Sequence, residues 1–393
     1  MAWALTPLTE DQRSVQAVAR EFAAGEIAPF SATWDRDAYF EPALVQKLGE
    51  LGFLGMMIPE EYDGLGLSTL TYLVALEEIA LVDASVAVML SVHNSLPTQM
   101  ILKWGSEKQK EEFLKPMARG ERLGAFALSE PEAGSDAASL RTQAVRDGDD
   151  WILNGTKAWV SSGTKGDVII AMARTDSADD RRGARGISAF IITPDLPGFS
   201  VGKKEDKMGL RASPTVQLHF SDMRVPGNRL LGQAGSGFIY AMQSLDNGRL
   251  GIAAQAIGIA ESALRYSAAY AAERRQFGHP IKEFQAIQFK LADMATRVSA
   301  ARALLHMSAT AKDRGEHMTQ FSAMAKLLAS ETAMWVTTQA IQIFGGYGYV
   351  SDYPVERLFR DAKVTEIYEG TSEIQRIVIA RELYSHEKVQ RHS

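Results

Sequence analysis

The stretch LDNGRLGIAAQAIGIAESAL, residues 245–264, has the pattern of a long buried helix. Its apolar residues recur at every third or fourth position, at Leu250, Ala253, Ile257, Ala260 and Leu264. Narrow stripes of this kind, rich in alanine, suit helices that pack closely in a bundle. Residues 287–305 and 324–335 continue the pattern, and residues 372–383 predict a last helix. The sequence therefore predicts a C-terminal four-helix bundle over residues 233–393.

The first part of the chain also predicts helices. Thr9 and Gln12 fit the capping box that often opens a helix. The runs 42–51 and 68–80 carry apolar residues at helical spacing. Residues 1–122 are therefore expected to form an N-terminal α-helical domain.

Between these helical parts, residues 123–232 change to short apolar runs separated by turn residues. The runs that predict strands are 151–160, 167–173, 187–192 and 215–220. Within the first run, Asn154-Gly155 predicts a type I′ hairpin turn, because both central positions of that turn need a positive φ. We expect a small antiparallel β-barrel or sandwich here, and thus a fold that is mainly α with a central β domain.

Composition limits the chemistry. The chain has 393 residues, no cysteine and seven scattered histidines. Thiolate chemistry is excluded, and no metal site is expected because no pair such as H-E-x-x-H occurs. The net charge is −6 without a basic stripe, so nucleic acid is not an expected partner. No apolar run of about 18 residues predicts membrane insertion. The start MAWALTPLTEDQRSV lacks a signal pattern, so a cytoplasmic location is expected.

Common nucleotide-binding and hydrolase motifs are missing as well. Neither GQAGSGF (232–238) nor FGGYGYV (344–350) has the spacing of a Rossmann fingerprint. The chain contains no P-loop and no G-x-S-x-G elbow. An enzyme with this pattern needs another source of chemistry, such as a flavin bound without a Rossmann fold.

The segment IYEGTSEIQR, residues 367–376, contains the most informative carboxylate. Glu369 stands in a short turn ahead of a helix start. Ser372 and Gln375 fit an S-x-x-Q capping box, which would make the glutamate an ordinary residue of the lead-in turn. A carboxylate held beside the ring of Tyr368 is also positioned to take a proton. The residues alone leave both interpretations open.

Seven longer motifs stand in sequence along nearly the whole chain. They are FALSEPEAGSD (126–136), NGTKAWVSSG (154–163), KKEDKMGLRAS (203–213), LDNGRLGIAAQAIGIAESAL (245–264), YAAERRQFGHPIKEFQAIQFKLADM (270–294), QIFGGYGYVSDYPVERLFRDAK (342–363) and VTEIYEGTSEIQR (364–376). In this order they resemble the acyl-CoA dehydrogenase family, and most of all its short-chain and short-branched-chain members. The resemblance implies an N-terminal helical domain, a β domain and a bundle, with FAD between the last two.

The reaction implied by this resemblance is α,β-dehydrogenation of an acyl-CoA thioester to the trans-2-enoyl-CoA. Glu369 matches the family's base, which removes the α-proton while flavin N5 takes the β-hydride. Gly370, which has no side chain, lets the thioester approach the main chain. Gly248 stands where some relatives carry the base, and a glycine cannot act as one. When bound substrate expels water, we expect burial to raise the pKa of Glu369 more than the following helix start lowers it.

Further site residues follow from the same resemblance. Matches to substrate contacts are Ser135, Asp246, Arg249 and Gly370. Matches to FAD contacts are Phe126, Leu128, Ser129, Trp159, Ser161, Arg274, Phe277, Gln285, Gln342, Gly346, Thr371 and Glu373. Taken singly, Asp246 and Arg249 also fit a helix-surface ion pair, and Trp159 fits a hairpin core residue.

The implied partners are an acyl-CoA substrate and an electron-transferring flavoprotein. A homotetramer whose subunits share each flavin site is implied, with a dimer left open. Two alternatives stand beside the dehydrogenase: an oxidase of the same fold that uses O₂, and a non-catalytic scaffold that binds CoA or flavin. Straight butyryl-like and branched 2-methyl substrates are both compatible with the sequence.

Overall fold

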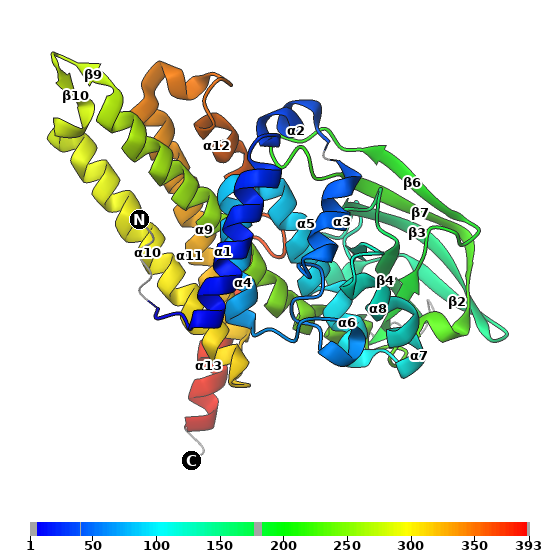
Figure 1. Ribbon diagram of the computed structural model, residues 1–393. Coiled ribbons are helices and arrows are strands. Elements are labelled where there is room, and N and C mark those ends of the chain that lie inside the picture. Colours follow the sequence, from blue (N-terminus) through cyan, green and yellow to red (C-terminus); the bar gives the residue numbers. More distant parts are fainter. Residues whose placement is uncertain (1–5, 40, 177–182, 391–393) are drawn as a thin grey trace.

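A computed structural model describes residues 6–39, 41–176 and 183–390, without the side chains of 385–390. Short helices and a sheet lie on one side of the molecule, and long helices lie on the other (Figure 1). Within the described ranges, no helix is long and apolar enough to cross a membrane.

The N-terminal part consists of helices, as predicted. They are α1 (Glu10–Phe22), α2 (Ser31–Asp37), α3 (Pro42–Glu50), α4 (Thr69–Val82), α5 (Ala84–Ser95), α6 (Pro97–Trp104), α7 (Glu107–Gln109) and α8 (Lys115–Ala118). The capping box is confirmed, because Thr9 Oγ1 accepts from the Gln12 N–H at 3.2 Å and Gln12 Oε1 accepts from the Thr9 N–H at 3.0 Å. Almost every residue of α4 and α5 is buried, which places this helix pair in the centre of the molecule.

The middle part forms one sheet. Its strands are β1 (Gly124–Ala127), β2 (Gln143–Asp147), β3 (Asp150–Ser161), β4 (Val168–Arg174), β5 (Ile187–Ile192), β6 (Phe199–Lys204), β7 (Thr215–Val225) and β8 (Leu230–Leu231). The order is β6-β7-β3-β2-β4-β5-β8, with β1 beside β4. Most pairs are antiparallel, but β4 pairs in parallel with both β1 and β2. The described strands do not close into a ring, so the β domain is an open, mixed sheet rather than a purely antiparallel barrel.

The predicted hairpin at Asn154-Gly155 is wrong. Strand β3 runs straight through both residues, with a register shift against β7 at this point. The turn lies earlier, between β2 and β3, where Gly148 has a φ of 63°. Gly155 serves close packing instead, because a Cβ there would lie 2.4 Å from Thr142 Oγ1. Asn154 is bonded across the sheet to Asp222 at 3.0 Å.

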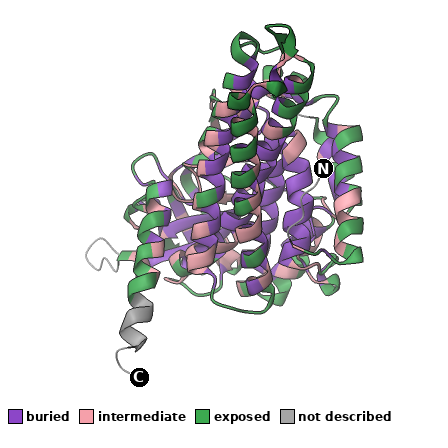
Figure 2. Cartoon of the chain, turned by 90° about the vertical axis from the view of Figure 1, so that its left-hand side faces the viewer, coloured by how far each residue is buried: buried purple, intermediate pink, exposed green. Residues whose placement is uncertain are grey.

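The C-terminal part contains the predicted long helices and one more. These are α9 (Gly237–Glu273), α10 (Gln285–Asp313), α11 (Thr319–Phe344), the shorter α12 (Val355–Val364) and α13 (Ser372–Gln390). A small hairpin of β9 (Arg275–Gln276) and β10 (His279–Pro280) joins α9 to α10 at the end of the bundle farthest from the sheet (Figure 1). Helix α9 packs against α4, α5, α10 and α11. Buried residues fill the centre, and the outward faces of the bundle are exposed (Figure 2).

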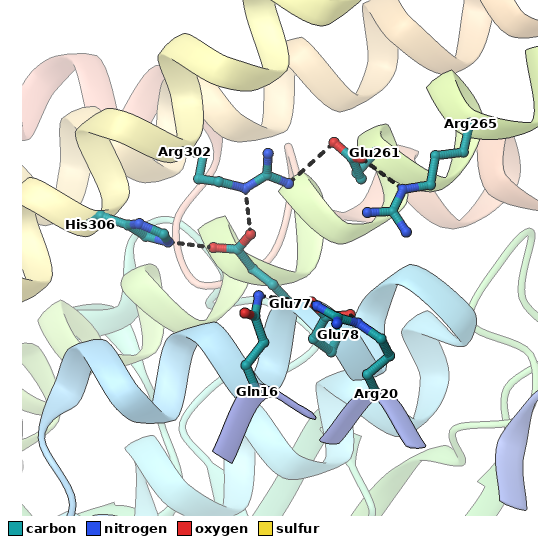
Figure 3. Close-up of polar contacts among 8 residues, drawn as sticks. All are labelled: Gln16, Arg20, Glu77, Glu78, Glu261, Arg265, Arg302 and His306. Atoms are coloured by element: carbon teal, nitrogen blue, oxygen red, sulfur yellow. Dashed lines mark hydrogen bonds and ion pairs between the residues drawn. The ribbon is translucent and has the colours of Figure 1, made fainter. Parts of the chain in front are cut away.

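A network of buried charges ties the N-terminal helices to the bundle (Figure 3). Glu77 of α4 accepts from Arg302 Nε at 2.8 Å and lies 2.9 Å from His306 Nε2, both on α10. Its neighbour Glu78 accepts from Arg20 Nη2 of α1 at 2.8 Å. Glu261 of α9 joins the same network through Arg302 at 3.3 Å. Two adjacent glutamates of α4 thus bind different helices: Glu77 binds α10, and Glu78 binds α1.

Glu77→Gln is expected to lower the free energy of unfolding by about 3 kcal/mol, because it leaves the buried charge of Arg302 without its main partner. The measurement is urea denaturation at pH 7. Glu316→Gln is the matched control, since Glu316 forms an exposed pair with Arg314 and should change stability by less than about 1 kcal/mol. Equal effects of the two substitutions would contradict the assignment.

The effect of Glu77 should also depend on pH. Burial alone would raise the pKa of Glu77, but Arg302 and His306 hold it below the ordinary value of 4.5. A carboxylate with a lowered folded pKa stabilises the protein above its unfolded pKa and loses that effect as the pH falls through the folded pKa. The stability gap between the native protein and Glu77→Gln should therefore be full at neutral pH and shrink below pH 4.5.

Candidate active site

Glu369 lies in the turn that joins α12 to α13. Its φ is 51°, and that of Gly370 is 93°. A non-glycine residue in this region costs about 1 kcal/mol or more, so the surroundings must hold the turn. Lys326 Nζ of α11 donates to the Gly370 carbonyl at 2.8 Å, and Gln375 Nε2 donates to the carbonyls of Gly370 at 2.8 Å and Glu369 at 3.2 Å. The backbone of Glu369 is thus fixed from two helices.

The helix start after this turn differs from the prediction. Helix α13 begins at Ser372, and Thr371 Oγ1 accepts from the Ile374 N–H at 3.3 Å. Ser372 Oγ is buried and has no hydrogen-bond partner among the residues that the structure describes. The predicted capping box at Ser372 and Gln375 is therefore wrong: Thr371 is the N-cap, and Gln375 binds the turn carbonyls. The Glu369 carboxylate caps no helix in the described part of the chain.

The side chain of Glu369 is unusual. Although the residue is partly exposed, both carboxylate oxygens are buried, and neither has a hydrogen-bond partner among the described residues. Burial raises the pKa of Glu369 to about 7, against the opposing influence of Lys326 and Arg249. An unpartnered buried carboxylate is costly and is rarely kept for structure alone. A carboxylate that titrates near neutral pH is suited to general-base catalysis.

Glycines of α9 make room for this carboxylate. A Cβ at Gly248 would lie 2.0 Å from Glu369 Oε2. One turn further on, a Cβ at Gly251 would lie 2.3 Å from Ser91 Oγ and 3.3 Å from the Tyr72 hydroxyl. The two hydroxyls are buried close to each other, and within the described structure neither has another side-chain or main-chain partner. Unpartnered polar atoms thus gather along one face of α9 beside Glu369.

The predicted substrate residues are only partly brought together. Asp246 and Arg249 form an ion pair of 2.6 Å along α9, but Arg249 is buried, so this is not a surface pair. Arg249 lies close enough to Glu369 to lower the pKa of that carboxyl group. Gly370 follows Glu369 directly in the chain. Ser135 is exposed in the loop between β1 and β2, far from this group in sequence.

Five of the predicted FAD residues lie in two adjoining segments of the sheet domain. Phe126 belongs to β1, with Leu128 and Ser129 directly after it, while Trp159 and Ser161 belong to β3. The Ala158 N–H donates to the Ser129 carbonyl at 2.9 Å, which places the segments side by side. A register shift between Lys157 and Val160 turns Trp159 outward with a φ of 61° and 63% exposure. Trp159 is therefore not a hairpin core residue, and its exposed ring beside main-chain polar groups fits a planar cofactor.

The other predicted FAD residues divide into two groups. Thr371 and Glu373 flank the start of α13, next to Glu369. The remainder lie around the β9–β10 hairpin and the end of α11, far from the sheet (Figure 1): Arg274, Phe277, Gln285, Gln342 and Gly346. Phe277 is 92% exposed, and the Arg274 guanidinium lies 5.3 Å from the Tyr347 ring centre. Within one chain, this group and the sheet group do not meet.

Several residues shape the site in roles that their sequence motifs did not predict. Lys326 and Gln375 fix the turn at Glu369 and Gly370, and the Tyr368 hydroxyl donates to Gln255 Oε1, which orients the residue before Glu369. Gln255 Nε2 in turn donates to the Ala84 carbonyl at 2.7 Å. The available signal was a polar residue within an otherwise apolar helical stripe, as at Gln255 and Lys326.

The buried carboxylate of Glu369 can take a proton, whereas the transfer of a hydride needs a cofactor that the protein binds and orients. The chain belongs to the acyl-CoA dehydrogenase family. Models of the family's N-terminal, middle and C-terminal domains match residues 9–121, 125–223 and 235–384. The family depends on FAD, so the protein is an FAD-dependent acyl-CoA dehydrogenase.

Relatives support this assignment along nearly the full chain. The mitochondrial short-chain specific acyl-CoA dehydrogenase of Mus musculus is 50% identical over 96% of this chain and 90% of its own. Butyryl-CoA dehydrogenase of Megasphaera elsdenii has a TM-score of 0.94 at 45% identity, covering 96% of this chain and 99% of that one. A chain from the structural work on the electron transferring flavoprotein of Acidaminococcus fermentans also has a TM-score of 0.94, at 48% identity over 98% of this chain and 99% of that one.

Proposed function

We propose that the protein oxidises short-chain acyl-CoA thioesters to their trans-2-enoyl-CoA products, with Glu369 as the base. The observation that carries this proposal is the pair of buried, unpartnered oxygens on a carboxylate whose pKa is raised to about 7. When bound, FAD supplies the acceptor for the hydride that leaves the β-carbon. The experiment is anaerobic addition of butyryl-CoA, which should bleach the yellow flavin absorbance. Persistent absorbance at saturating butyryl-CoA would contradict the short-chain assignment.

The other roles in the reaction belong to residues of this chain. Glu369 removes the α-proton, and the low-polarity surroundings keep its carboxylate reactive. The thioester carbonyl lies against the main chain of Glu369 and Gly370, whose turn is held rigid by Lys326 and Gln375. A fixed N–H aimed at the developing enolate oxygen stabilises it more than it stabilises the ground state. The helix start at Thr371 and the buried Arg249 add positive potential here, which partly offsets the cost that burial imposes on a negative charge.

A preference for short acyl chains is supported by the packing next to the base. The side chains of Tyr72 and Ser91 pack against Gly251, which lies one helical turn from Gly248, the glycine beside Glu369. This leaves less room along α9 for a long acyl chain. Rates with straight acyl-CoA substrates of increasing length, measured with a dye acceptor, should fall steeply beyond the short-chain range. A 2-methyl branched substrate should be included, since a branched chain fills a different volume.

The proposed acceptor is an electron-transferring flavoprotein, and the proposed assembly is a homotetramer. The likeness to a chain studied with such a flavoprotein supports the acceptor. Support for shared flavin sites comes from Arg274 and Phe277, which are set at the far end of the bundle although they match FAD contacts. Sedimentation of the holoprotein tests the assembly. The reduced holoprotein should be reoxidised slowly by O₂ and rapidly by the electron-transferring flavoprotein. Rapid reoxidation by O₂ would instead indicate an oxidase.

The reaction should depend on the ionisation of Glu369. Because the base must be deprotonated, kcat/KM is expected to rise with pH through about 7 and then level off. Lys326 lowers the pKa of Glu369, so Lys326→Met should move this midpoint to higher pH. Lys363→Met is the control, since Lys363 forms an exposed pair with Glu366. A flat profile from about pH 5 to 9 would contradict the role of Glu369.

A further inference from the structure

The sheet domain contains a buried ion pair that the proposed reaction does not use. Lys157 of β3 is 0% exposed, and its Nζ lies 2.7 Å from Glu130 Oε1, whose side chain is 7% exposed. Glu130 also accepts from the N–H groups of Arg141 at 2.6 Å and Thr142 at 2.9 Å. Burial lowers the pKa of Lys157 to about 8, although Glu130 opposes this. Burying such a pair is expensive and often contributes little to stability.

The pair lies between the two segments proposed to contact FAD. Glu130 follows Ser129 by one residue and Leu128 by two, and Lys157 precedes Trp159 by two. The hydrogen bond from the Ala158 N–H to the Ser129 carbonyl joins the same two segments. Lys157 therefore lies behind the proposed flavin contacts rather than among them.

Lys157 has a second contact, which is to the main chain. Its Nζ donates to the Leu128 carbonyl at 3.2 Å. This carbonyl and the Ser129 N–H belong to one peptide group. A cation at the oxygen withdraws electron density from the peptide and makes its N–H a stronger donor, because hydrogen bonds in a chain polarise one another. The low polarity around a buried ammonium increases this effect.

We propose that Lys157 is a positioning residue for the flavin site, one that polarises the peptide between Leu128 and Ser129 and thereby favours the reduced cofactor over the oxidised one. The inference rests on the proposed function, since it requires Ser129 to face FAD. Reduction adds negative charge to the ring system, so a stronger donor and a nearby cation bind the reduced form more tightly. Glu130 holds Lys157 in place and fixes the 130–133 turn, in which the Glu130 and Ala133 backbones bond to each other at 3.0 and 3.1 Å.

The test compares the two redox forms in the holoprotein. Lys157→Gln keeps a neutral donor at this position, and Lys157→Met removes the donor as well. Both should lower the FAD reduction potential, measured against redox dyes, as the reduced form loses at least tenfold more affinity than the oxidised form. For a two-electron couple, tenfold corresponds to about 30 mV. Lys157→Arg should stay closer to the native potential.

Fluorescence titration of the apoproteins with FAD provides the second measurement. Lys312→Met is the control, because burial lowers the pKa of Lys312 to about 8 but this lysine belongs to α10. An unchanged potential in Lys157→Gln, with or without weaker FAD binding, shows a merely structural role and overturns the inference while leaving the proposed reaction intact. A native protein that binds no FAD would overturn both. If Lys157→Met does not fold, Lys157→Gln alone decides.

Discussion

Glu369→Gln is expected to reduce turnover of butyryl-CoA by about 10⁴-fold, the upper range for loss of a general base. The amide has nearly the same size and keeps the turn bonds of Lys326 and Gln375, which involve main-chain carbonyls. FAD should therefore remain bound with an unchanged oxidised spectrum. Stopped-flow absorbance under anaerobic conditions measures the flavin bleaching directly and separates it from slower product release.

Glu366→Gln is the matched control for this substitution. Glu366 lies three residues earlier and is already paired with Lys363 at 2.6 Å, so its loss should change turnover less than about twofold. Retention of more than a tenth of native turnover in Glu369→Gln would show that another group removes the proton.

Gly248→Ala is expected to have the second largest effect. The added methyl group would lie 2.0 Å from Glu369 Oε2, much closer than any stable contact. Either the carboxylate or α9 must move, and a shift of about 1 Å in a catalytic group can cost about 100-fold in rate. We expect kcat to fall by at least this factor, with a displaced pH profile, because the new methyl also changes the surroundings of the carboxylate.

Gly25→Ala provides the control, since a Cβ at Gly25 meets nothing within 4 Å. This variant should keep native activity. Thermal unfolding of both variants separates a local displacement from a general loss of stability. Native kcat in a folded Gly248→Ala protein would mean that the carboxylate does not need its present position.

Much of the fold could be predicted because its signals are local. The capping box at Thr9 and Gln12 and the alanine-rich stripe along α9 both follow from the helical period, and both are confirmed. The mixed pairing of β4 could not be predicted, since parallel neighbours depend on a crossover connection and not on the strand's own sequence. Helix α12 was missed because only a short amphipathic stretch marks it.

The predicted turn at Asn154-Gly155 and the predicted helix cap at Ser372 were wrong because tertiary contacts determine the local structure there. Asn154-Gly155 has the composition of a hairpin turn, but the close approach of Thr142 and the bond to Asp222 keep it within β3. At α13 the capping position moved by one residue to Thr371, since Ser372 points into the interior.

In the candidate site, too, local motifs could be recognised from the sequence but tertiary contacts could not. Glu369 could be selected from its motif, but the lack of a partner for its oxygens among the described residues depends on helices α9 and α11, which are distant in sequence. The clash that makes Gly248 necessary is visible only when these helices are in place. Lys326 and Gln375 act on the main chain of the turn, and a sequence motif does not report main-chain contacts.

The most direct test of the account follows the α-proton itself. The native holoprotein is incubated anaerobically in D₂O with butyryl-CoA, and deuterium at C2 of the recovered thioester is measured by mass spectrometry. Exchange at C2 should occur with the native protein and with Glu366→Gln, and should be absent with Glu369→Gln. Exchange at the native rate in Glu369→Gln would contradict the claim that this carboxylate is the base.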